Sequence, residues 1–324
     1  QGCHFLSVLY MMMSIRYSIT IQKAVWRSHF VKKKNKLISA SFSTTSAVSS
    51  EETNSLVVGP PQKSLIPPGN CQFGEDFVSV PLLSRTSVSH NSSVLRFGLP
   101  DESLPLNLST CACILAQALV DQEAVIRPYT PISTNVQVGS FDLLVKNYGA
   151  QGTMSTHLNE MEVGDTVNFK HIPFNVKIQA PFEQSHIVML AGGTGIAPMI
   201  QALHAILGDV ESKAKVTLLY GSQTSDDILG FDLLKQWEQD YPERLEVVHV
   251  LSHEDGDTSS GFTSGFVDQK LLENHVPDIN SDETLVLVCG PPPMYEALCG
   301  PRDVPELAGI LSDMGCSAAQ VYKF

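Results

Sequence analysis

The sequence of 324 residues lacks the features of several protein classes. No stretch approaches 18 consecutive apolar residues, so a conventional membrane-spanning helix is not expected. The seven cysteines are an odd and scattered set, and the closest pair, Cys111 and Cys113, has a spacing that matches none of the usual zinc frameworks. The ten histidines show no H-E-x-x-H or comparable ligand spacing. These absences favour a reducing compartment and no structural metal.

Acidic residues are absent from residues 1–50, which contain seven Lys and Arg and thirteen Ser and Thr. A basic, hydroxyl-rich and acid-free composition is typical of an organelle transit peptide. The alternatives are a disordered basic tail or translated upstream sequence. The apolar patch over residues 5–13 is too short to span a bilayer, so we expect membrane association only through this N-terminal segment.

The remainder of the chain is strongly acidic. Of the 21 basic and 34 acidic residues of the whole sequence, 14 basic and 34 acidic residues lie in 51–324, a net charge of −20. Nucleic-acid binding is therefore not expected, because phosphates require patches of Lys and Arg. This charge suits a soluble enzyme, or one whose partner carries a basic face.

The pattern of the body changes once along the chain. Residues 51–70 are rich in Pro, Gly and Ser and are interpreted as a linker. Residues 71–182 contain short β-like runs broken by Gly, Pro, Asn and Asp, which predicts an antiparallel sheet or barrel. Residues 183–324 alternate strands with helical stretches, among them a predicted helix over 226–242. That alternation predicts a parallel, doubly wound sheet.

The sharpest local signal is the motif GGTGIAPM, from Gly192 to Met199, placed between a predicted strand and a predicted helix. Glycines let the backbone approach a pyrophosphate, and the helix N-terminus supplies free N–H groups. The motif lacks the Lys of a Walker-type loop and the third Gly of G-x-G-x-x-G. The alternative is a tight strand–helix turn with small residues for packing.

Two further clusters could belong to the same site. CGPPPM, from Cys289 to Met294, ends the last confident strand, and ligands of open α/β sheets lie beyond the carboxyl ends of strands. We therefore expect it to face the same crevice as the glycine motif, although Cys289 alone could be a small buried hydrophobe. RPYTPIS, from Arg127 to Ser133, offers an Arg for phosphate and a Tyr for stacking on a ring. Without context it could be an edge strand with an exposed Arg.

The motifs RPYTPIS, DLLVKNY, GTMS, GGTGIAPM and CGPPPM, in this order and with an aromatic last residue, resemble the NADH–cytochrome b5 reductase family of ferredoxin–NADP reductase-like flavoenzymes. The similarity runs from about Phe77 to Phe324. It implies an antiparallel six-stranded FAD-binding β-barrel followed by a doubly wound parallel-sheet NAD-binding domain. The implied activity is hydride transfer from NADH to FAD, then transfer of single electrons to a haem protein such as cytochrome b5. Residues 309–324 are similar to the mitochondrial and plant members, so a mitochondrial location is expected.

The resemblance also implies site residues by motif position. Arg127 would bind the FAD pyrophosphate, Tyr129 would pack along the flavin, and Thr130 would lie near flavin N5. Lys146 matches the family lysine that is associated with cofactor phosphate and NADH binding. The other implied FAD-site residues are Pro128, Val145, Tyr148, Gly152, Met154 and Ser155. The implied NADH-site residues are Gly193, Thr194, Gly195, Met199, Cys289, Gly290, Pro291 and Pro292, with Phe324 where the nicotinamide enters. Thr130 and Cys289 are the candidate catalytic residues.

Several positions depart from the family pattern. Thr153 stands where members usually carry Lys or Arg, and the segment 105–123 fits no clean structural template. His253 aligns with an acidic residue that disfavours NADPH, although Glu254 and Asp255 follow it. The preference for NADH over NADPH therefore stays open. So do two alternatives for function: the same module serving another acceptor, and a degenerate nucleotide-binding protein without turnover.

Overall fold

The computed structural model describes residues 56, 58–63, 70–149, 152–172, 182–254 and 261–324. Residues Glu51–Phe324 form one compact unit. The predicted transit segment and much of the predicted linker lie outside the described residues. Across the described ranges, no helix combines the length and the apolar character needed to cross a membrane.

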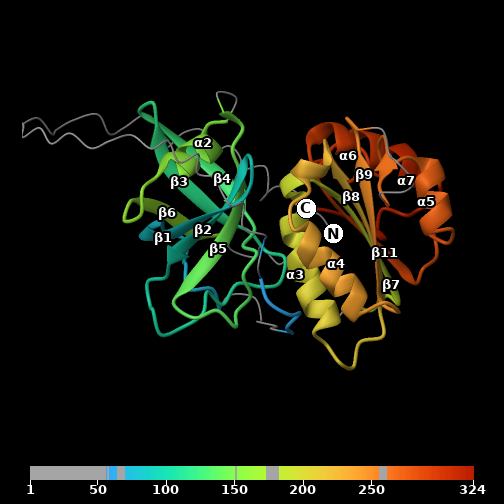
Figure 1. The fold of residues 1–324 in the computed structure, drawn as a ribbon, viewed down its shortest axis with the longest axis horizontal. Coiled ribbons are helices and arrows are strands. Elements are labelled where there is room, and N and C mark those ends of the chain that lie inside the picture. The colour runs from blue at the N-terminus through green and yellow to red at the C-terminus, as the bar shows by residue number, and fades with distance from the viewer. Residues whose placement is uncertain (1–55, 57, 64–69, 150–151, 173–181, 255–260) are drawn as a thin grey trace, which may run out of the picture. The chain divides into compact units, whose positions relative to one another are not determined.

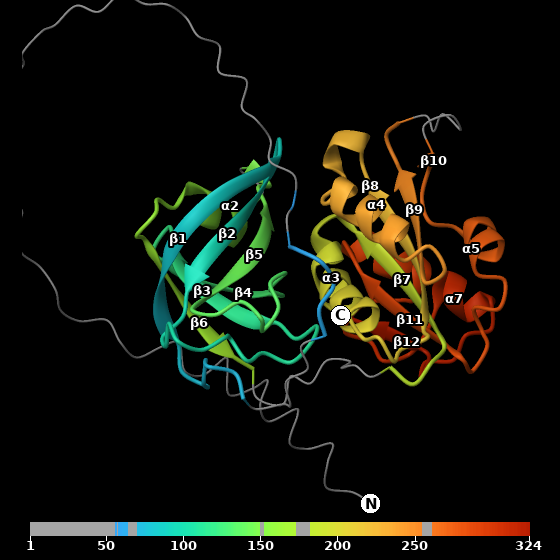
Figure 2. The same cartoon turned by 60° about the horizontal axis from the view of Figure 1, so that its bottom comes forward.

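The first sheet is antiparallel and has six strands in the order β4-β3-β6-β1-β2-β5. Its strands are β1 (Val78–Ser89), β2 (Ser92–Gly98), β3 (Ile114–Val120), β4 (Glu123–Tyr129), β5 (Ser140–Lys146) and β6 (Thr166–His171). Figures 1 and 2 show this sheet curling around a core, beside the short helix α2 (Met154–Glu160). The predicted antiparallel six-stranded domain is confirmed.

An aromatic cluster forms the centre of this first core. Phe73, Phe97, Phe141 and Phe169 are all at most 1% exposed, and their ring centroids lie 5.0–5.9 Å apart in stacked and edge-on pairs. Such pairs contribute about 0.5–1.5 kcal/mol beyond the area that they bury. Because these rings come from three strands and the segment before β1, they hold the curled sheet together.

Strand β3 and the turn that leads into β4 lie in the segment 105–123, which fitted no template. Strand β3 alternates buried and less buried residues, which is the pattern of a half-buried strand. The two-residue loop consists of Asp121 and Gln122, with φ of 49° and 68°. A tight hairpin turn needs positive φ at both positions, which Asn-Gly or Asp-Gly usually supplies. Because Gln122 rarely adopts a positive φ, the sequence did not indicate this turn.

The second sheet is parallel and also has six strands, in the order β10-β9-β8-β7-β11-β12. Its strands are β7 (His186–Gly192), β8 (Lys215–Ser222), β9 (Leu245–Leu251), β10 (Thr263–Ser264), β11 (Thr284–Cys289) and β12 (Val321–Lys323). The helices are α3 (Ile196–Leu207), α4 (Phe231–Asp240), α5 (Gln269–His275), α6 (Pro292–Leu298) and α7 (Gly309–Asp313). The predicted doubly wound parallel sheet is confirmed.

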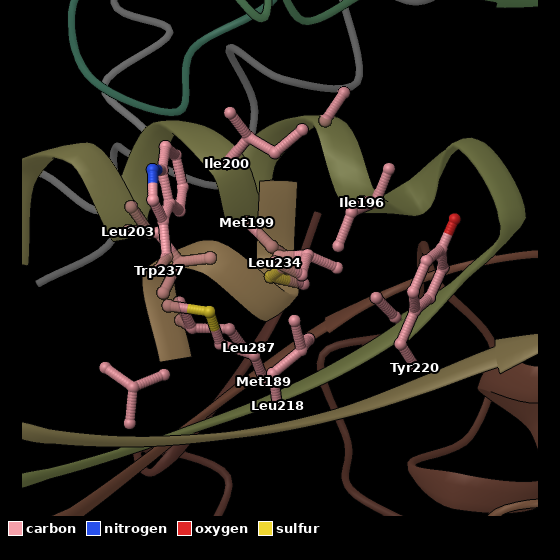
Figure 3. Close-up of a cluster of buried hydrophobic side chains, with 14 of the residues drawn as sticks. Met189, Ile196, Met199, Ile200, Leu203, Leu218, Tyr220, Leu234, Trp237 and Leu287 are labelled. Atoms are coloured by element: carbon pink, nitrogen blue, oxygen red, sulfur yellow. The ribbon is translucent and has the colours of Figure 1, made fainter. Parts of the chain in front are cut away.

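Helices cover both faces of the parallel sheet. Figure 1 shows α3 and α4 on one face and α5, α6 and α7 on the other. Successive strand residues point to opposite faces, so Met189 packs with the α3–α4 layer while Val188 and Leu190 pack with the other helices. Figure 3 shows Met199 and Trp237 in the first of these layers. Both side chains are at most 2% exposed, so truncation of either would cost about 2–5 kcal/mol.

The predicted helix over 226–242 begins later than the sequence suggests. A 3-10 turn, η3 (Ser225–Asp227), comes first, and α4 begins only at Phe231. Gly230 between them has φ of 76°, a left-handed conformation that ends any continuous helix at this point. The polar residues before Gly230 therefore form a strand-end loop rather than a first helical turn.

Part of the predicted linker is packed against α3 and α4. Leu56 is 3% exposed and contacts the position of Gly230. The backbone N–H of Gln62 donates to Nδ1 of His204 at 3.2 Å, and the Lys63 ammonium lies 2.7 Å from the carboxylate of Asp209. These residues fix the path of the chain along the helical layer.

Candidate active site

One cavity of about 840 Å³ collects residues of both sheets. This volume is near the upper end of the range of small-molecule sites, roughly 300–1,000 Å³. The predicted site residues that line it are Pro128, Tyr129, Thr130, Val145, Lys146, Tyr148, Ser155, Gly193, Thr194, Gly195, Cys289, Gly290, Pro291 and Phe324. The structure thus brings residues of all five sequence motifs to one place.

The other predicted site residues lie off the cavity wall. Arg127 is exposed on β4, where its guanidinium donates to the carbonyl of Ile126. Gly152 precedes α2, and Pro292 begins α6. Met154 and Met199 are 1% and 0% exposed. The two methionines belong to the hydrophobic cores, so packing accounts for them without a ligand.

The glycine motif forms a turn at the carboxyl end of β7. Gly193 has φ of 53°, and its carbonyl accepts a hydrogen bond from the Tyr220 hydroxyl at 2.9 Å. A Cβ on Gly195 would overlap the carbonyl oxygen of Cys289. The two Gly/Pro motifs therefore touch, as expected for residues beyond the carboxyl ends of neighbouring parallel strands. The N-terminal N–H groups of α3 follow directly and suit an anion.

Hydrogen bonds connect the RPYTPIS segment to the helix after the glycine motif. Nε2 of Gln201 on α3 donates to the carbonyls of Pro131 at 2.9 Å and Ser133 at 2.6 Å. The Cys111 thiol donates to the carbonyl of Pro198 at 3.3 Å. Burial raises the pKa of the Cys111 thiol, so this sulfur is a structural group rather than a nucleophile.

The last residue of the sequence is held in the cavity wall. Strand β12 pairs with β11, and the backbone N–H of Phe324 donates to the carbonyl of Val288 at 3.0 Å. The Tyr295 hydroxyl donates to the carbonyl oxygen of Phe324 at 2.9 Å. The ring packs edge-on against Tyr322, with centroids 5.0 Å apart. A ring fixed in this way can position a planar ligand.

The charged side chains of the cavity wall differ from those of residues 51–324 as a whole, which are mostly acidic. Among the described residues that line it, Asp227 carries the one carboxylate, and Lys146 and Arg302 carry positive charge. Nζ of Lys146 lies 2.9 Å from Oδ1 of Asp227. Burial alone would raise the pKa of Asp227, but hydrogen bonds from Lys146, Thr224 and Asn91 outweigh it and hold this pKa at about 2. The wall therefore suits an anionic ligand.

At the carboxyl end of β9, where the sequence predicts discrimination against NADPH, the described residues on the cavity wall carry no carboxylate. Ser252 and His253 line the cavity, and the serine hydroxyl lies 2.9 Å from Nδ1 of the imidazole. Glu254 instead accepts hydrogen bonds from the backbone N–H and the hydroxyl of Ser225, at 3.0 and 3.1 Å. Asp255 lies outside the described residues.

Sequence reasoning missed several residues of this site. Asp227 was assigned to a helix, although it follows the carboxyl end of β8, where ligands of open α/β sheets bind. Applying that rule to every strand would have found it. Cys111, Cys113 and Tyr220 carried no motif, and only the tertiary structure places the cysteines on the cavity wall and the tyrosine under Gly193.

The residues present fit FAD and a pyridine dinucleotide. Strand β4 is exposed along most of its length, including Arg127 and Pro128, and so leaves a surface for a ligand to cover. Tyr129 and Thr130 continue this surface into the cavity, where the glycine turn lies. The arrangement offers stacking surfaces, hydroxyl donors and a helix N-terminus to a flavin and a dinucleotide.

The fold and the cavity define a class of protein, the oxidoreductases in which an FAD-binding domain precedes an NAD-binding domain. The family description of an oxidoreductase FAD-binding domain matches residues 79–173, and that of an oxidoreductase NAD-binding domain matches residues 189–300. NADH-cytochrome b5 reductase 1 of Lodderomyces elongisporus is 42% identical over 226 residues, which are 69% of this chain and 73% of that protein. The chain therefore belongs to the NADH–cytochrome b5 reductase family.

Other relatives agree with this assignment. NADH-cytochrome b5 reductase 2 of Botryotinia fuckeliana is 38% identical over 256 residues, covering 77% of this chain and 73% of that protein. Among solved structures, the cytochrome b5 reductase domain of Ulva prolifera nitrate reductase has a TM-score of 0.68 and 29% identity. That match covers 81% of this chain and 100% of the other.

Proposed function

We propose that this protein is an FAD-dependent reductase that takes a hydride from NADH and passes electrons singly to a haem protein such as cytochrome b5. The observation that carries the proposal is the shared cavity, in which Tyr129 and Thr130 from the first sheet line one wall with Gly193, Cys289 and Phe324 from the second. Hydride transfer requires such a meeting place, because the two reacting atoms must approach to about 3–3.5 Å.

The first sheet supplies the residues that would hold FAD. Arg127 would pair with its pyrophosphate, and its exposed guanidinium donates to the carbonyl of Ile126, a contact that can be given up. Tyr129 would pack along the flavin, and Thr130 would donate a hydrogen bond near the reacting nitrogen. Val145 and Ser155 would complete the wall. When bound, FAD supplies the hydride-accepting and one-electron chemistry.

The second sheet supplies the residues that would hold NADH. Gly193 and Gly195 would let the backbone approach the pyrophosphate, and the N-terminus of α3 would stabilise its charge. Cys289 and Phe324 would orient the nicotinamide and exclude water beside it. No general base is needed, because the transferred hydrogen leaves with its electron pair.

A flavin spectrum tests the proposal. We expect the purified full-length chain, reconstituted with FAD, to be yellow and to bleach under anaerobic conditions when NADH is added. A correctly folded preparation that cannot be reconstituted with FAD would refute the proposal. Flavin that is retained but reduced by neither NADH nor NADPH would favour a nucleotide-binding protein without turnover.

We propose cytochrome b5 as the electron acceptor, supported by the two fungal relatives that carry this name. The same module could serve another acceptor, which the match to a nitrate reductase domain favours as the second candidate. Steady-state rates with cytochrome b5 and with ferricyanide distinguish the two. A high ferricyanide rate with no detectable cytochrome b5 reduction would contradict the first candidate.

We further propose a mitochondrial location, supported by the basic and acid-free composition of residues 1–50. Membrane association would then be confined to that segment. Two fusions to a fluorescent protein test this. The fusion that carries residues 1–50 ahead of the fluorescent protein should collect in mitochondria, and the fusion that carries residues 51–324 instead should not. Equal distribution of both fusions would contradict the proposal.

A further inference from the structure

Asp227 connects the parallel sheet to the first sheet through a single carboxylate. Oδ2 stays within its own loop, where it accepts hydrogen bonds from the hydroxyl of Thr224 at 2.9 Å and from its backbone N–H at 3.3 Å. Oδ1 accepts hydrogen bonds from Nζ of Lys146 at 2.9 Å and Nδ2 of Asn91 at 3.1 Å. The imidazole of His90 lies 3.8 Å away. One oxygen thus fixes the loop, and the other contacts the first sheet.

The ion pair is shielded from water. The side chains of Lys146 and Asp227 are 17% and 8% exposed. Exposed ion pairs contribute little to stability, whereas removing one partner of a shielded pair leaves a charge that needs a new partner. The depressed pKa of Asp227, about 2, keeps the carboxylate charged throughout the neutral range. Lys146 is therefore held in place whenever the cavity contains no other anion.

A bound dinucleotide would compete for the same ammonium. Lys146 and the glycine turn line one cavity, and Arg302 is the only other Lys or Arg among the described lining residues. A pyrophosphate carries two negative charges and binds the N-terminus of α3 in the proposed function. Because an ammonium is a compact charge with three donors, Lys146 can shift from Asp227 towards the phosphates without leaving the wall.

We propose that Asp227 is a positioning residue that holds Lys146 at the cavity wall and yields it to the phosphates of the incoming dinucleotide. This inference rests on the proposed function and adds an element of regulation to it. Each binding event breaks the Lys146–Asp227 pair, and each release of the dinucleotide restores it. The pair therefore weakens binding of both NADH and NAD⁺ and favours product release.

Anaerobic stopped-flow reduction of the FAD-loaded full chain tests the proposal. The dependence of the bleaching rate on NADH concentration gives a Kd and a limiting rate, and titration of the oxidised protein gives the Kd of NAD⁺. We expect Asp227→Asn to lower both Kd values by on the order of fivefold, a typical coupling between two sites. A purely structural role would instead raise Kd.

Two variants show whether the effect acts through Lys146. Lys146→Met should raise Kd, and adding Asp227→Asn to it should change Kd no further. If Asp227→Asn still lowers the Kd of NADH when Lys146 has been replaced, the effect is a general effect of charge, and the proposal is overturned. Asn91→Ala removes the neutral contact to the same oxygen and should leave Kd within about twofold.

The outcome can be separated from failure of the proposed function. If NADH does not bleach the flavin of the unmodified protein, the proposed function is wrong. If it does, and flavin-retaining Asp227→Asn binds NADH no more tightly, only the role of Asp227 is wrong. Should Asp227→Asn lose flavin, Asp227→Ser repeats the test, because serine is also neutral and suits this turn. The same tightening is expected, and its absence overturns the proposal.

Discussion

Replacing Gly195 with alanine would probe the contact between the two Gly/Pro motifs. Gly195 has φ of −61° and ψ of −8°, a right-handed conformation that alanine adopts without strain. Its Cβ would overlap the carbonyl oxygen of Cys289 and lie 2.6 Å from the carbonyl carbon and 3.0 Å from the backbone nitrogen of Gly290. These are backbone atoms, so the overlap is relieved only if the two loops separate.

The expected loss of NADH affinity in Gly195→Ala follows from this overlap. Forcing an extra methyl group into a packed site costs about 1–3 kcal/mol. If the dinucleotide must restore the native loop spacing, its affinity falls by roughly 5- to 150-fold. The first sheet does not contact Gly195 in this way, so we expect the variant to retain FAD and its yellow colour.

Anaerobic bleaching over a range of NADH concentrations measures this loss. Gly221→Ala is the matched control, because Gly221 also lines the cavity but its Cβ would meet only the carbonyl oxygen of Ala191, at an ordinary 3.6 Å. The control should bind NADH within about threefold of the unmodified protein. Gly195→Ala with unchanged affinity, or an equal loss in Gly221→Ala, would refute the steric reasoning.

Three further predictions concern single side chains. Arg127→Ala should weaken FAD retention by about 1.5–3 kcal/mol with little change in the melting temperature of the apoprotein, because the guanidinium is exposed and donates to a neighbouring backbone carbonyl; unchanged flavin occupancy after dialysis would contradict this. Tyr220→Phe removes the hydroxyl that donates to the Gly193 carbonyl at 2.9 Å and should raise the Kd of NADH about two- to tenfold. An unaltered Kd would show that the glycine turn keeps its conformation without this hydrogen bond. Burial lowers the pKa of His204 to about 4 from 6.5, so its contribution to the free energy of unfolding is fully present above pH 6.5. Up to about 3 kcal/mol of the free energy of unfolding is lost as the pH falls through 4. Urea unfolding at several pH values should show a smaller loss in His204→Gln than in the unmodified protein. Identical dependence of the unfolding free energy on pH in the two proteins would contradict this.

Local patterns were sufficient for the central elements of both sheets. The run KVTLLYGS became β8 over Lys215–Ser222, and the apolar periodicity after the glycine motif became α3. Buried parallel strands and a buried helix carry their own signal, because their hydrophobic residues recur at a fixed period. The hairpin at Asp121 and Gln122 carried no such signal, since one of its two positive φ values falls on Gln122, a residue that rarely adopts it.

The residues of the site divide in the same way. Gly193 and Cys289 could be assigned to one crevice from sequence, because carboxyl ends of neighbouring parallel strands meet at one sheet edge. Asp227 could not be assigned, because its partners Lys146 and Asn91 lie 81 and 136 residues away along the chain. Nothing in a local pattern specifies which carboxylate an ammonium will meet at that separation.

The amino-acid sequence by itself determined the two kinds of sheet, the glycine turn between strand and helix, and the family, since each depends on residues close together in the chain. Only the tertiary structure decided that Gln201 on α3 donates to Pro131 and Ser133 beside the flavin-site motif, and that one carboxylate holds Lys146. Those contacts depend on how the two sheets pack against each other, and packing is set by the summed shape and charge of many residues rather than by any one segment.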